Sequence, residues 1–299
     1  MKISICVTTY NVAPYIRQCL DSVLMQKLDI PYKIIVVDDC STDETASILK
    51  EYGARFPAVF QLHFNEANLR SCRNSLKAWS LADSDFISIL DGDDYWTDKD
   101  KLQKQVNALK ENQHAVMCHH DGYIEDATGK RKRFNRLDRP AEYEIDLLLT
   151  DTNIWNSSVV YRNVLHGQYP DWMNNLIHHD HTLHLLHALH GSILYIDEPL
   201  GIYRIHETNT SKKWIGDRAT EFSRTAIYAC NRLKKEMPRK YHAVINLGAA
   251  RHYDLIAGHY WKKHAFIKFF FTVLRGYLLC PLRSIREYKD SYYHLFRQP

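Results

Sequence analysis

Three short apolar runs, each ending in polar side chains, constrain the fold of this chain more than any other feature. They are ISICVTT at 3–9, KIIVVDD at 33–39 and DFISILD at 85–91. Unbroken β-branched runs of this length are typical of parallel strands that are buried on both faces of a sheet. The runs therefore predict the central strands of an α/β protein.

The segments between these strands predict helices. Residues 15–26 carry apolar side chains at helical spacing, and residues 41–53 have a cap signature at Ser41 or Thr42 and end at Gly53. Alternation of strand and helix predicts a Rossmann-like, doubly wound, mostly parallel sheet. Later in the chain we predict strands at 157–162 and 192–197, a helix at 181–191, and only helices from about 215 onward.

Polar side chains follow each of the three strands. In doubly wound sheets, ligands bind beyond the carboxyl ends of the strands, so these side chains are expected to meet at one edge. They are Thr8, Thr9, Tyr10 and Asn11 after the first strand, Asp38 and Asp39 after the second, and Asp91, Asp93 and Asp94 after the third.

The sequence LDGDDYW at 90–96 crowds three carboxylates into four positions. Such carboxylates raise each other's pKa unless a cation compensates for their charge. One interpretation is a site for Mn²⁺ or Mg²⁺, and the other is a hydrated acidic turn. An EF-hand is excluded because its twelfth position would be Leu102. No glycine-rich phosphate loop follows the first strand, so bound phosphates would need another counter-charge.

Composition narrows the classes of protein. The formal net charge is only +4, which gives no support to nucleic-acid binding. The seven cysteines are scattered without a CxxC pair, which favours a reducing compartment over a disulfide or zinc framework. The longest apolar stretch, at 269–282, is interrupted by Arg275 and is too short to span a membrane. We therefore expect a cytoplasmic protein, soluble or bound at the inner membrane surface.

Taken together, six segments resemble the successive signatures of the family 2 glycosyltransferases of GT-A fold. They are VTTYN at 7–11, VVDDCSTDET at 36–45, RSCRN at 70–74, LDGDDYW at 90–96, HHD at 178–180 and YRIHETNTS at 203–211. The order and spacing of the segments are similar to those of the family. The resemblance implies an inverting, metal-dependent transfer of a sugar from a nucleotide diphosphate sugar to a hydroxyl group.

The resemblance also implies residues that bind the donor. Thr8 and Tyr10 would border the nucleotide base, Asp39 would accept a hydrogen bond from the ring N–H, and Arg73 would help to hold the nucleotide. Uridine diphosphate is the favoured carrier, with thymidine and guanosine carriers as alternatives.

By the same resemblance, Asp91 and Asp93 form the DxD pair around the metal, and Asp94 supports them. His206 is a further candidate ligand for the metal or the diphosphate, with a structural hydrogen bond as the alternative. Asp180 matches the general base of inverting members, but His179 stands where the family often has Glu.

Other features have competing interpretations. The histidines at 181, 184, 187 and 190 are spaced by three residues and do not converge on one zinc ion, so we expect them to flank a core helix. Trp96, Trp155 and Trp172 could stack on sugar rings, although core packing is the more common role. The basic loop at 129–139 is either a solvated loop or a phosphate-binding patch.

The chain is expected to divide into a catalytic domain at 1–212 and a helical, basic and aromatic region at 213–299. Within the first, residues 1–100 would form the nucleotide-sugar half and 101–212 the acceptor half. Segment 259–283 is either an interfacial helix that touches anionic lipid or an ordinary helical subdomain. The expected acceptor is a surface glycan or a lipid-linked oligosaccharide; a catalytically silent glycan- or nucleotide-binding scaffold of the same fold is the alternative function.

Overall fold

The structure is a computed structural model that describes residues 1–134, 140–150, 154–177, 179–207, 209 and 218–281. Its internal contacts divide the chain into two compact units. The first comprises Met1–Ile145, Thr152–Asn174 and Leu183–His206, and the second comprises Asp146–Asp151, Asn175–Thr182 and Glu207–Pro299. Each unit is described by itself.

The first unit is built on one mixed sheet with the strand order β3-β2-β1-β4-β9-β6-β10-β5. The three central strands β1 (Ile3–Thr9), β2 (Tyr32–Asp38) and β4 (Phe86–Asp91) are parallel, as their apolar runs predict. Their neighbours are β3 (Phe60–Phe64), β5 (Tyr95–Trp96), β6 (Ala115–Glu125), β9 (Val160–Arg162) and β10 (Ser192–Arg204), while β7 (Arg131–Arg133) and β8 (Glu142–Tyr143) pair with β6 and β10.

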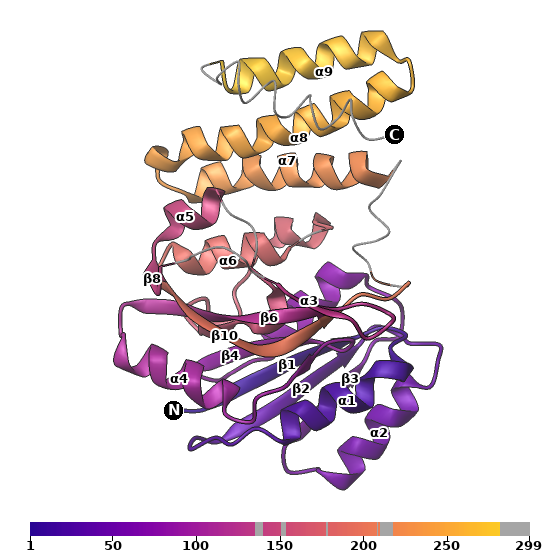
Figure 1. Ribbon diagram of the computed structural model, residues 1–299, viewed down its shortest axis with the longest axis vertical. Helices are drawn as coiled ribbons and strands as arrows, with labels where there is room; N and C mark the ends of the chain where they lie inside the picture. The colour runs from indigo at the N-terminus through magenta and orange to yellow at the C-terminus, as the bar shows by residue number, and fades with distance from the viewer. Residues whose placement is uncertain (135–139, 151–153, 178, 208, 210–217, 282–299) are drawn as a thin grey trace. The chain divides into compact units, whose positions relative to one another are not determined.

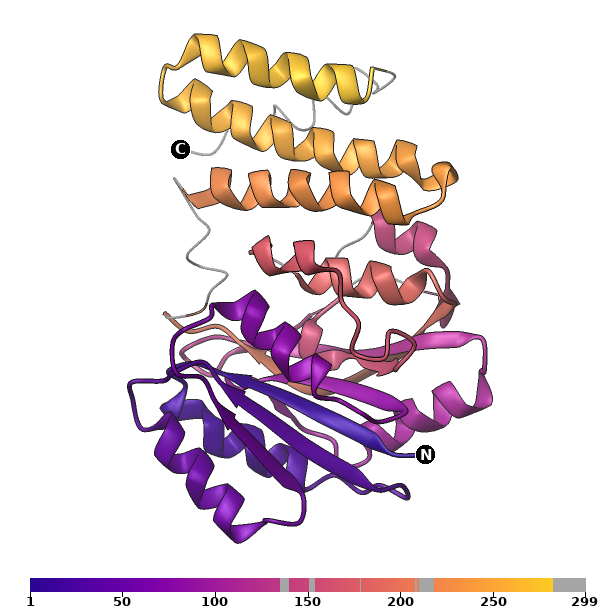
Figure 2. The same cartoon turned by 180° about the vertical axis from the view of Figure 1, so that it is seen from behind.

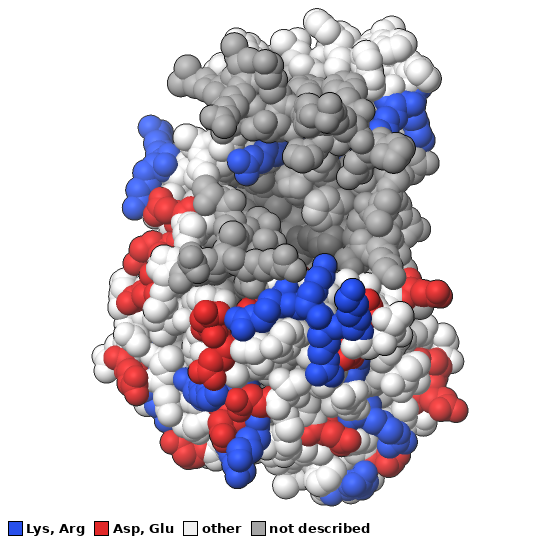
Figure 3. Space-filling model, in the orientation of Figure 1, with Lys and Arg blue, Asp and Glu red and all other residues white. Residues whose placement is uncertain are grey.

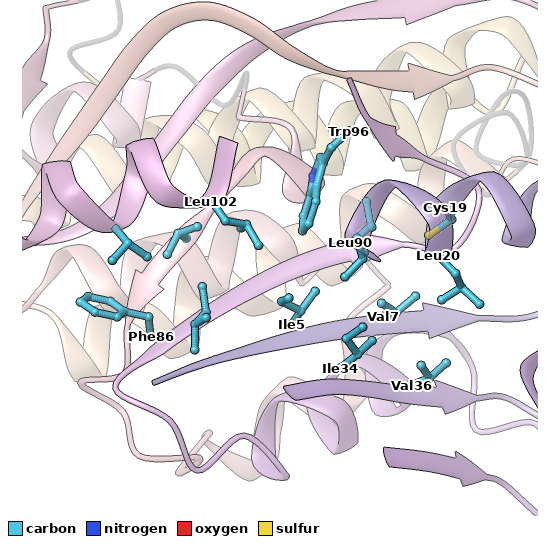
Figure 4. Packing of buried hydrophobic residues seen from close by; sticks show 14 of the residues in the cluster. Ile5, Val7, Cys19, Leu20, Ile34, Val36, Phe86, Leu90, Trp96 and Leu102 are labelled. Carbon is cyan, nitrogen blue, oxygen red and sulfur yellow. The ribbon is translucent and has the colours of Figure 1, made fainter. Parts of the chain in front are cut away.

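Helices cover both faces of this sheet (Figure 1). The helices α1 (Ala13–Leu24), α2 (Thr45–Arg55) and α4 (Lys101–Glu111) share one hydrophobic core with the sheet. In that core Ile5 of β1 and Leu90 of β4 lie beside Leu20 of α1 and Leu102 of α4 (Figure 4). Helix α3 (Ser71–Ser80) covers the opposite face, which Figure 2 shows from behind. There the Cys6 thiol donates to the Ala78 carbonyl oxygen at 3.4 Å.

The second unit contains three long helices, α7 (Arg218–Glu236), α8 (His242–Lys262) and α9 (Phe266–Leu279), which lie side by side with alternating direction (Figure 1). Two shorter helices each contain residues of both units. They are α5 (Ile145–Thr150) and α6 (Asp180–Ala188). Within the described ranges, no helix is both long and apolar enough to cross a lipid bilayer.

Two predicted boundaries are wrong. Helix α2 begins at Thr45 instead of Ser41 or Thr42, because Ser41 uses its backbone N–H and its hydroxyl on the Asp38 carboxylate. The strand predicted at 157–162 is shorter, since residues Asn156–Ser158 form a 3-10 turn before β9. The predicted α/β fold with a mostly parallel sheet and C-terminal helices is confirmed.

Candidate active site

The carboxyl ends of β1, β2 and β4 lie at one edge of the sheet, as expected. Thr9 pairs with Asp38 across β1 and β2, and Thr8 pairs with Asp91 across β1 and β4. The chain leaves β4 through Gly92, whose backbone N–H donates to the Thr8 carbonyl oxygen at 2.9 Å. A Cβ atom at position 92 would lie 2.8 Å from Thr9 Cγ2, so only glycine fits this turn without displacing β1.

The first of the paired acids after β2, Asp38, holds the loops together. Its buried carboxylate accepts hydrogen bonds from the Thr9 hydroxyl at 2.8 Å and from the Ser41 hydroxyl at 2.6 Å. Asn11, which has a φ of 52°, accepts a bond from the Thr42 backbone N–H at 2.7 Å through its side-chain oxygen. These contacts fix the two loops against each other.

The second acid, Asp39, accepts hydrogen bonds from the protein through one of its two carboxylate oxygens. Its Oδ1 accepts hydrogen bonds from the Asn65 side-chain amide at 2.9 Å and from the Leu69 backbone N–H at 2.7 Å. Asn65 is itself held by Asn74 at 2.8 Å and by Lys77 at 2.7 Å. Among the described residues, none donates a hydrogen bond to Asp39 Oδ2, so the network orients Asp39 without occupying that oxygen.

Asp91 and Asp93 lie at the same edge and contact different partners. Asp91 Oδ1 accepts a hydrogen bond from the Thr8 hydroxyl at 3.2 Å. Asp93 Oδ2 lies 3.0 Å from His206 Nε2, and the side chains of Asp93 and His206 are 22% and 10% exposed. The His206 ring packs against the Tyr15 ring with their centroids 4.5 Å apart. The structure thus brings Thr8, Asp91, Asp93 and His206 together.

Asp94 is buried and has a different role from its neighbours. Its Oδ2 accepts hydrogen bonds from Trp155 Nε1 at 2.7 Å and from the Ser157 hydroxyl at 2.8 Å, and its Oδ1 accepts one from the Arg204 backbone N–H at 3.0 Å. Burial raises the pKa of Asp94 well above its usual range, and the charges of Asp93 and Asp91 add to this effect. Asp94 therefore connects the acidic turn to β10 and is closed off from a ligand.

Arg204 is a charged residue of this site that sequence reasoning missed. Its guanidinium donates to the Asp93 carbonyl oxygen at 2.8 Å and to the side-chain oxygen of Gln18. It also stacks over the Tyr95 ring, 4.3 Å from the ring centroid. Arg204 lies two residues before His206 in the YRIH segment, and this position was the only hint of its role in the sequence. Its positive charge partly offsets the negative charge of the carboxylates in the acidic turn.

Tyr10 and Arg73, expected to contact the nucleotide, are both exposed in the first unit. Tyr10 is 46% exposed just after β1. Arg73 lies in the first turn of α3, and its Nε donates to the Asn174 carbonyl oxygen at 3.4 Å, a long hydrogen bond. Neither side chain is tied to the acidic turn by a described hydrogen bond.

Asp180 belongs to the second unit. It is the first residue of α6, and its side chain is 39% exposed. His179 Nε2 lies 3.2 Å from Asp180 Oδ1, and the His179 side chain is 5% exposed. Burial lowers the pKa of His179, against a smaller opposing effect of Asp180, so its ring is neutral at pH 7. His178, the first residue of the HHD segment, lies outside the described residues.

Over the described ranges, no three His, Cys, Asp or Glu side chains are arranged to hold a metal ion by themselves. His184 Nδ1 lies 2.6 Å from the Tyr161 hydroxyl, and His187 Nδ1 donates to the Leu183 carbonyl oxygen at 3.0 Å. Both rings are buried against the core, as a helix-flanking role requires.

The tryptophans are buried, and the described arginines of the basic loop are paired. Trp96, Trp155 and Trp172 are 1%, 4% and 8% exposed, which agrees with core packing. Arg131 Nε donates to Glu125 at 2.7 Å and Arg133 Nε to Asp121 at 2.6 Å. Figure 3 shows basic and acidic side chains mixed over the lower part of this face of the molecule. Residues 135–139 of the loop lie outside the described part.

Comparison with known proteins defines the class. Residues 4–166 match the family described as glycosyl transferase family 2, which is more than half of the chain. The chain therefore belongs to glycosyl transferase family 2, as its motifs predict. A Mycobacterium tuberculosis protein described as uncharacterized is 35% identical over 204 residues, 68% of this chain and 58% of that protein. The chain thus aligns with little more than half of that relative's length.

A further relative is the poly(ribitol-phosphate) beta-N-acetylglucosaminyltransferase TarS of Staphylococcus aureus, 35% identical over 121 residues, which are 39% of this chain and 20% of TarS. The solved structure of TarS residues 1–349 with UDP-GlcNAc has a TM-score of 0.62 at 20% identity and covers 99% of this chain and 79% of that one. A mannosyltransferase from Pyrobaculum calidifontis, solved with GDP-Man and Mn²⁺, has a TM-score of 0.60 at 14% identity, covering 99% and 81%. These structures share the fold.

Proposed function

We propose that this protein is an inverting, metal-dependent glycosyltransferase that moves a sugar from a nucleotide diphosphate sugar to a hydroxyl group. The observation that carries the proposal is the pair Asp93 and His206, two metal-binding groups 3.0 Å apart beside Asp91 and Thr8. His206 lies two residues beyond the end of β10 and 113 positions after Asp93, and it adds an imidazole nitrogen to the carboxylates of the turn. Because histidine is a common metal ligand, this pair supports a site for a divalent cation over a hydrated acidic turn.

The residues fit a metal that is shared with a bound diphosphate. Mg²⁺ and Mn²⁺ at such sites take one or two carboxylates from the protein and further oxygens from phosphate groups. Asp93 and His206 would be direct ligands, and Asp91 would complete the site from the β4 end. When bound, the metal would act as a Lewis acid that stabilises the charge of the leaving diphosphate.

The donor's nucleoside would lie between β1 and β2. Asp39 is buried and the Asn65 network holds its carboxylate through Oδ1, which leaves Oδ2 suited to a hydrogen bond from the ring N–H of uracil. The Tyr10 ring is exposed and available for contact with the base, and Thr8 would border it. Arg73 would hold the nucleotide from the α3 side. A uridine diphosphate sugar is the proposed donor.

Asp180 is the proposed general base. An inverting displacement needs a carboxylate that takes the proton of the acceptor hydroxyl as the oxygen attacks the anomeric carbon. Asp180 is partly exposed, so an acceptor can reach it. The neighbouring His179 ring is neutral, so it does not form an ion pair that would make the Asp180 carboxylate a weaker base.

The proposed acceptor is a surface glycan or a lipid-linked oligosaccharide, met at the inner face of the cell membrane. The name of the relative TarS describes a polymeric phosphate-containing acceptor for that protein, which supports an acceptor of this class. We propose that residues 1–100 bind the donor, that residues 101–212 bind the acceptor, and that residues 213–299 form a separate helical region, as the predicted domains suggest.

The experiment is a thermal-shift panel of uridine, thymidine and guanosine diphosphates and their sugars, with and without Mn²⁺. A ligand that binds only the native state raises the apparent stability, so the donor class appears as the nucleotide with the largest shift. We expect UDP and Mn²⁺ together to stabilise the wild type, and Asp93→Asn to abolish the metal-dependent part of the shift. Asp29→Asn is the matched control, because the Asp29 side chain is 61% exposed at another surface position.

A second readout separates binding from chemistry. Release of UDP from UDP-sugars, with water as the acceptor, reports the reaction without knowledge of the natural acceptor. Asp180→Asn is expected to keep the nucleotide shift and to lose roughly 10²-fold or more of the UDP release. Equal UDP release by Asp180→Asn and the wild type would remove the base assignment, and a full Mn²⁺-dependent shift in Asp93→Asn would remove the metal assignment.

A further inference from the structure

The surface of α9 is unusually apolar. Thirteen large hydrophobic side chains are exposed among the described residues, and nine of these lie between Leu255 and Leu278. Seven of the nine belong to α9 alone: Phe266, Ile267, Phe270, Phe271, Leu274, Tyr277 and Leu278, which are 39% to 77% exposed. An exposed apolar patch of this kind marks a contact with a partner or a membrane.

The apolar side chains form a stripe on the side of α9 that faces away from α8. Gly276 is buried, and a Cβ at that position would lie 3.2 Å from Tyr253 of α8. Phe269, seven residues earlier and therefore on the same side, packs on Trp261 with ring centroids 5.1 Å apart. Residues 267, 270, 271, 274 and 278 are spaced by three and four and lie on the opposite side. Helix α9 thus has two apolar faces, and the contacts that the structure describes within its own unit cover one of them.

The same segment carries the positive charge of the protein. Residues 255–281 contain Lys262, Lys263, Lys268 and Arg275 and no Asp or Glu, a charge of +4. The net charge of the whole chain is also +4, so the remaining residues sum to zero. Figure 3 shows blue side chains beside a largely uncharged surface at the α8–α9 end. Apolar and cationic groups therefore occupy one short segment.

A hollow beside this segment can accept an anion. It has a volume of about 280 Å³, and Arg224 of α7 and Arg275 of α9 line it. Arg224 also donates to the Tyr260 hydroxyl at 2.9 Å. No Asp or Glu is among the described residues that line the hollow. Two guanidinium groups that line the same hollow suit a phosphate group.

We propose that α9 and the α8–α9 turn dock on an anionic lipid bilayer. The stripe would enter the boundary between head groups and acyl chains, and the lysines and Arg275 would contact lipid phosphates. Fourteen residues of α-helix are about 21 Å long, so α9 lies along the surface and does not cross the bilayer.

A second copy of the chain is the less favourable occupant of this surface. A two-fold dimer places the same patch against itself, so each +4 surface would face another +4 surface. An anionic bilayer offers opposite charge and an apolar interior together. Charge complementarity therefore selects the lipid.

The test is co-sedimentation of the full chain with vesicles of phosphatidylcholine alone and of phosphatidylcholine with phosphatidylglycerol at 3:1. Wild type is expected to bind the second vesicle at least ten times more tightly than the first, and high salt is expected to weaken this binding. Phe270→Ser/Phe271→Ser and Lys262→Glu/Lys263→Glu are each expected to lower binding at least tenfold. The matched control is Lys27→Glu/Lys33→Glu, which makes the same charge change at two exposed lysines of the first unit and should bind as the wild type does.

Two further measurements keep the proposal open to refutation. Brominated acyl chains are expected to quench the fluorescence of Trp261, which is 40% exposed and touches the base of α9, and Trp261→Phe should remove that quenching. Sedimentation equilibrium reports self-association. Absence of binding to the anionic vesicles, or a dimer that Phe270→Ser/Phe271→Ser dissociates, would overturn the proposal. The nucleotide thermal shift is measured on the same samples, so failure of the lipid contact and failure of the proposed function are distinguishable.

Discussion

At the scale of single residues, the site depends on backbone conformations that its side chains do not favour. Asn11, Cys40 and Arg70 have positive φ angles of 52°, 61° and 70°. Each follows a strand or precedes a helix at the edge where the donor is proposed to bind. Strain of this kind costs about 1–2 kcal/mol for most residues other than glycine, whereas asparagine adopts positive φ more readily.

Cys40→Gly should stabilise the protein. Glycine removes the strain at φ 61°, and the larger entropy of the unfolded glycine chain offsets only part of that gain, so we expect about 0.5 kcal/mol. Chemical denaturation measures the change. Asn11→Gly is the contrasting variant and should destabilise, because the Asn11 side chain accepts the Thr42 N–H. A loss of stability in Cys40→Gly would show that its thiol contact with the Glu66 carbonyl at 3.7 Å outweighs the strain.

His187 should make the protein acid-sensitive. Burial lowers the pKa of His187 to about 4 in the folded protein, against an ordinary value of 6.5. Between these values the unfolded chain binds a proton that the folded protein does not, so stability falls as the pH falls from about 6.5 to 4. The loss amounts to about 3 kcal/mol.

Urea titrations from pH 7.5 to pH 4 measure this effect. His187→Phe keeps a ring beside Tyr161, whose centroid is 4.2 Å away, and should flatten the pH dependence by about one proton. His114→Gln is the control, because the His114 side chain is 75% exposed and should leave the dependence as it is. An unchanged slope in His187→Phe would assign the acid sensitivity to other buried groups such as His120, whose pKa burial also lowers.

At the scale of the elements, the sequence predicts strands well where apolar residues run without interruption. β1, β2 and β4 are such strands, and their polar ends meet at one edge of the sheet as predicted. β6 was missed because His119, His120 and Asp121 interrupt its apolar pattern although all three are buried. Their polarity is satisfied by contacts distant in sequence: His119 Nε2 lies 2.7 Å from the Tyr143 hydroxyl, and Asp121 accepts from Arg133. No local pattern contains that information.

In the candidate site, too, some residues can be found from local sequence and others only from contacts between distant segments. The DxDD turn and His206 belong to short motifs and could be found from sequence, whereas Arg204 is defined by its contacts with Asp93 and Gln18 on two other elements. The position of Asp94 among three donors also requires the fold, because Trp155 and Ser157 follow it by 61 and 63 residues in the sequence.

The turn between β4 and β5 should not accept a side chain at position 92. Gly92→Ala would place a methyl group 2.8 Å from Thr9 Cγ2 and 3.0 Å from the Thr8 carbonyl oxygen, and one of the two strands must shift. We expect a loss of roughly 2 kcal/mol in the free energy of unfolding and of the Mn²⁺-dependent nucleotide shift. Gly248→Ala is the control: a Cβ there meets nothing within 4 Å, so in the middle of α8 it should stabilise by about 1 kcal/mol. A Gly92→Ala variant with normal stability and nucleotide shift would contradict the tight packing of this turn.

At the scale of the whole molecule, the two proposed binding surfaces belong to different units. The donor groups Asp39 and Asp93 lie in the first unit, and the lysines at 262 and 263 lie in the second. If the two surfaces do not interact, changes at them act additively on stability and binding. We therefore expect Asp93→Asn to lose the metal-dependent nucleotide shift and keep vesicle binding, and Lys262→Glu/Lys263→Glu to do the reverse.

The combined variant decides whether the two surfaces are coupled. If they act independently, Asp93→Asn/Lys262→Glu/Lys263→Glu should show the two separate losses with no further change, and anionic vesicles should leave the UDP affinity of the wild type within about twofold. A tenfold rise in UDP affinity on vesicles would mean a coupling of about 1.4 kcal/mol, and by reciprocity UDP with Mn²⁺ would then tighten vesicle binding by the same factor. Titration of UDP with and without vesicles, repeated as titration of vesicles with and without UDP, measures both sides of that relation. Independence would mean that the helical unit only brings the enzyme to its acceptor, whereas coupling would mean that the membrane also regulates donor binding.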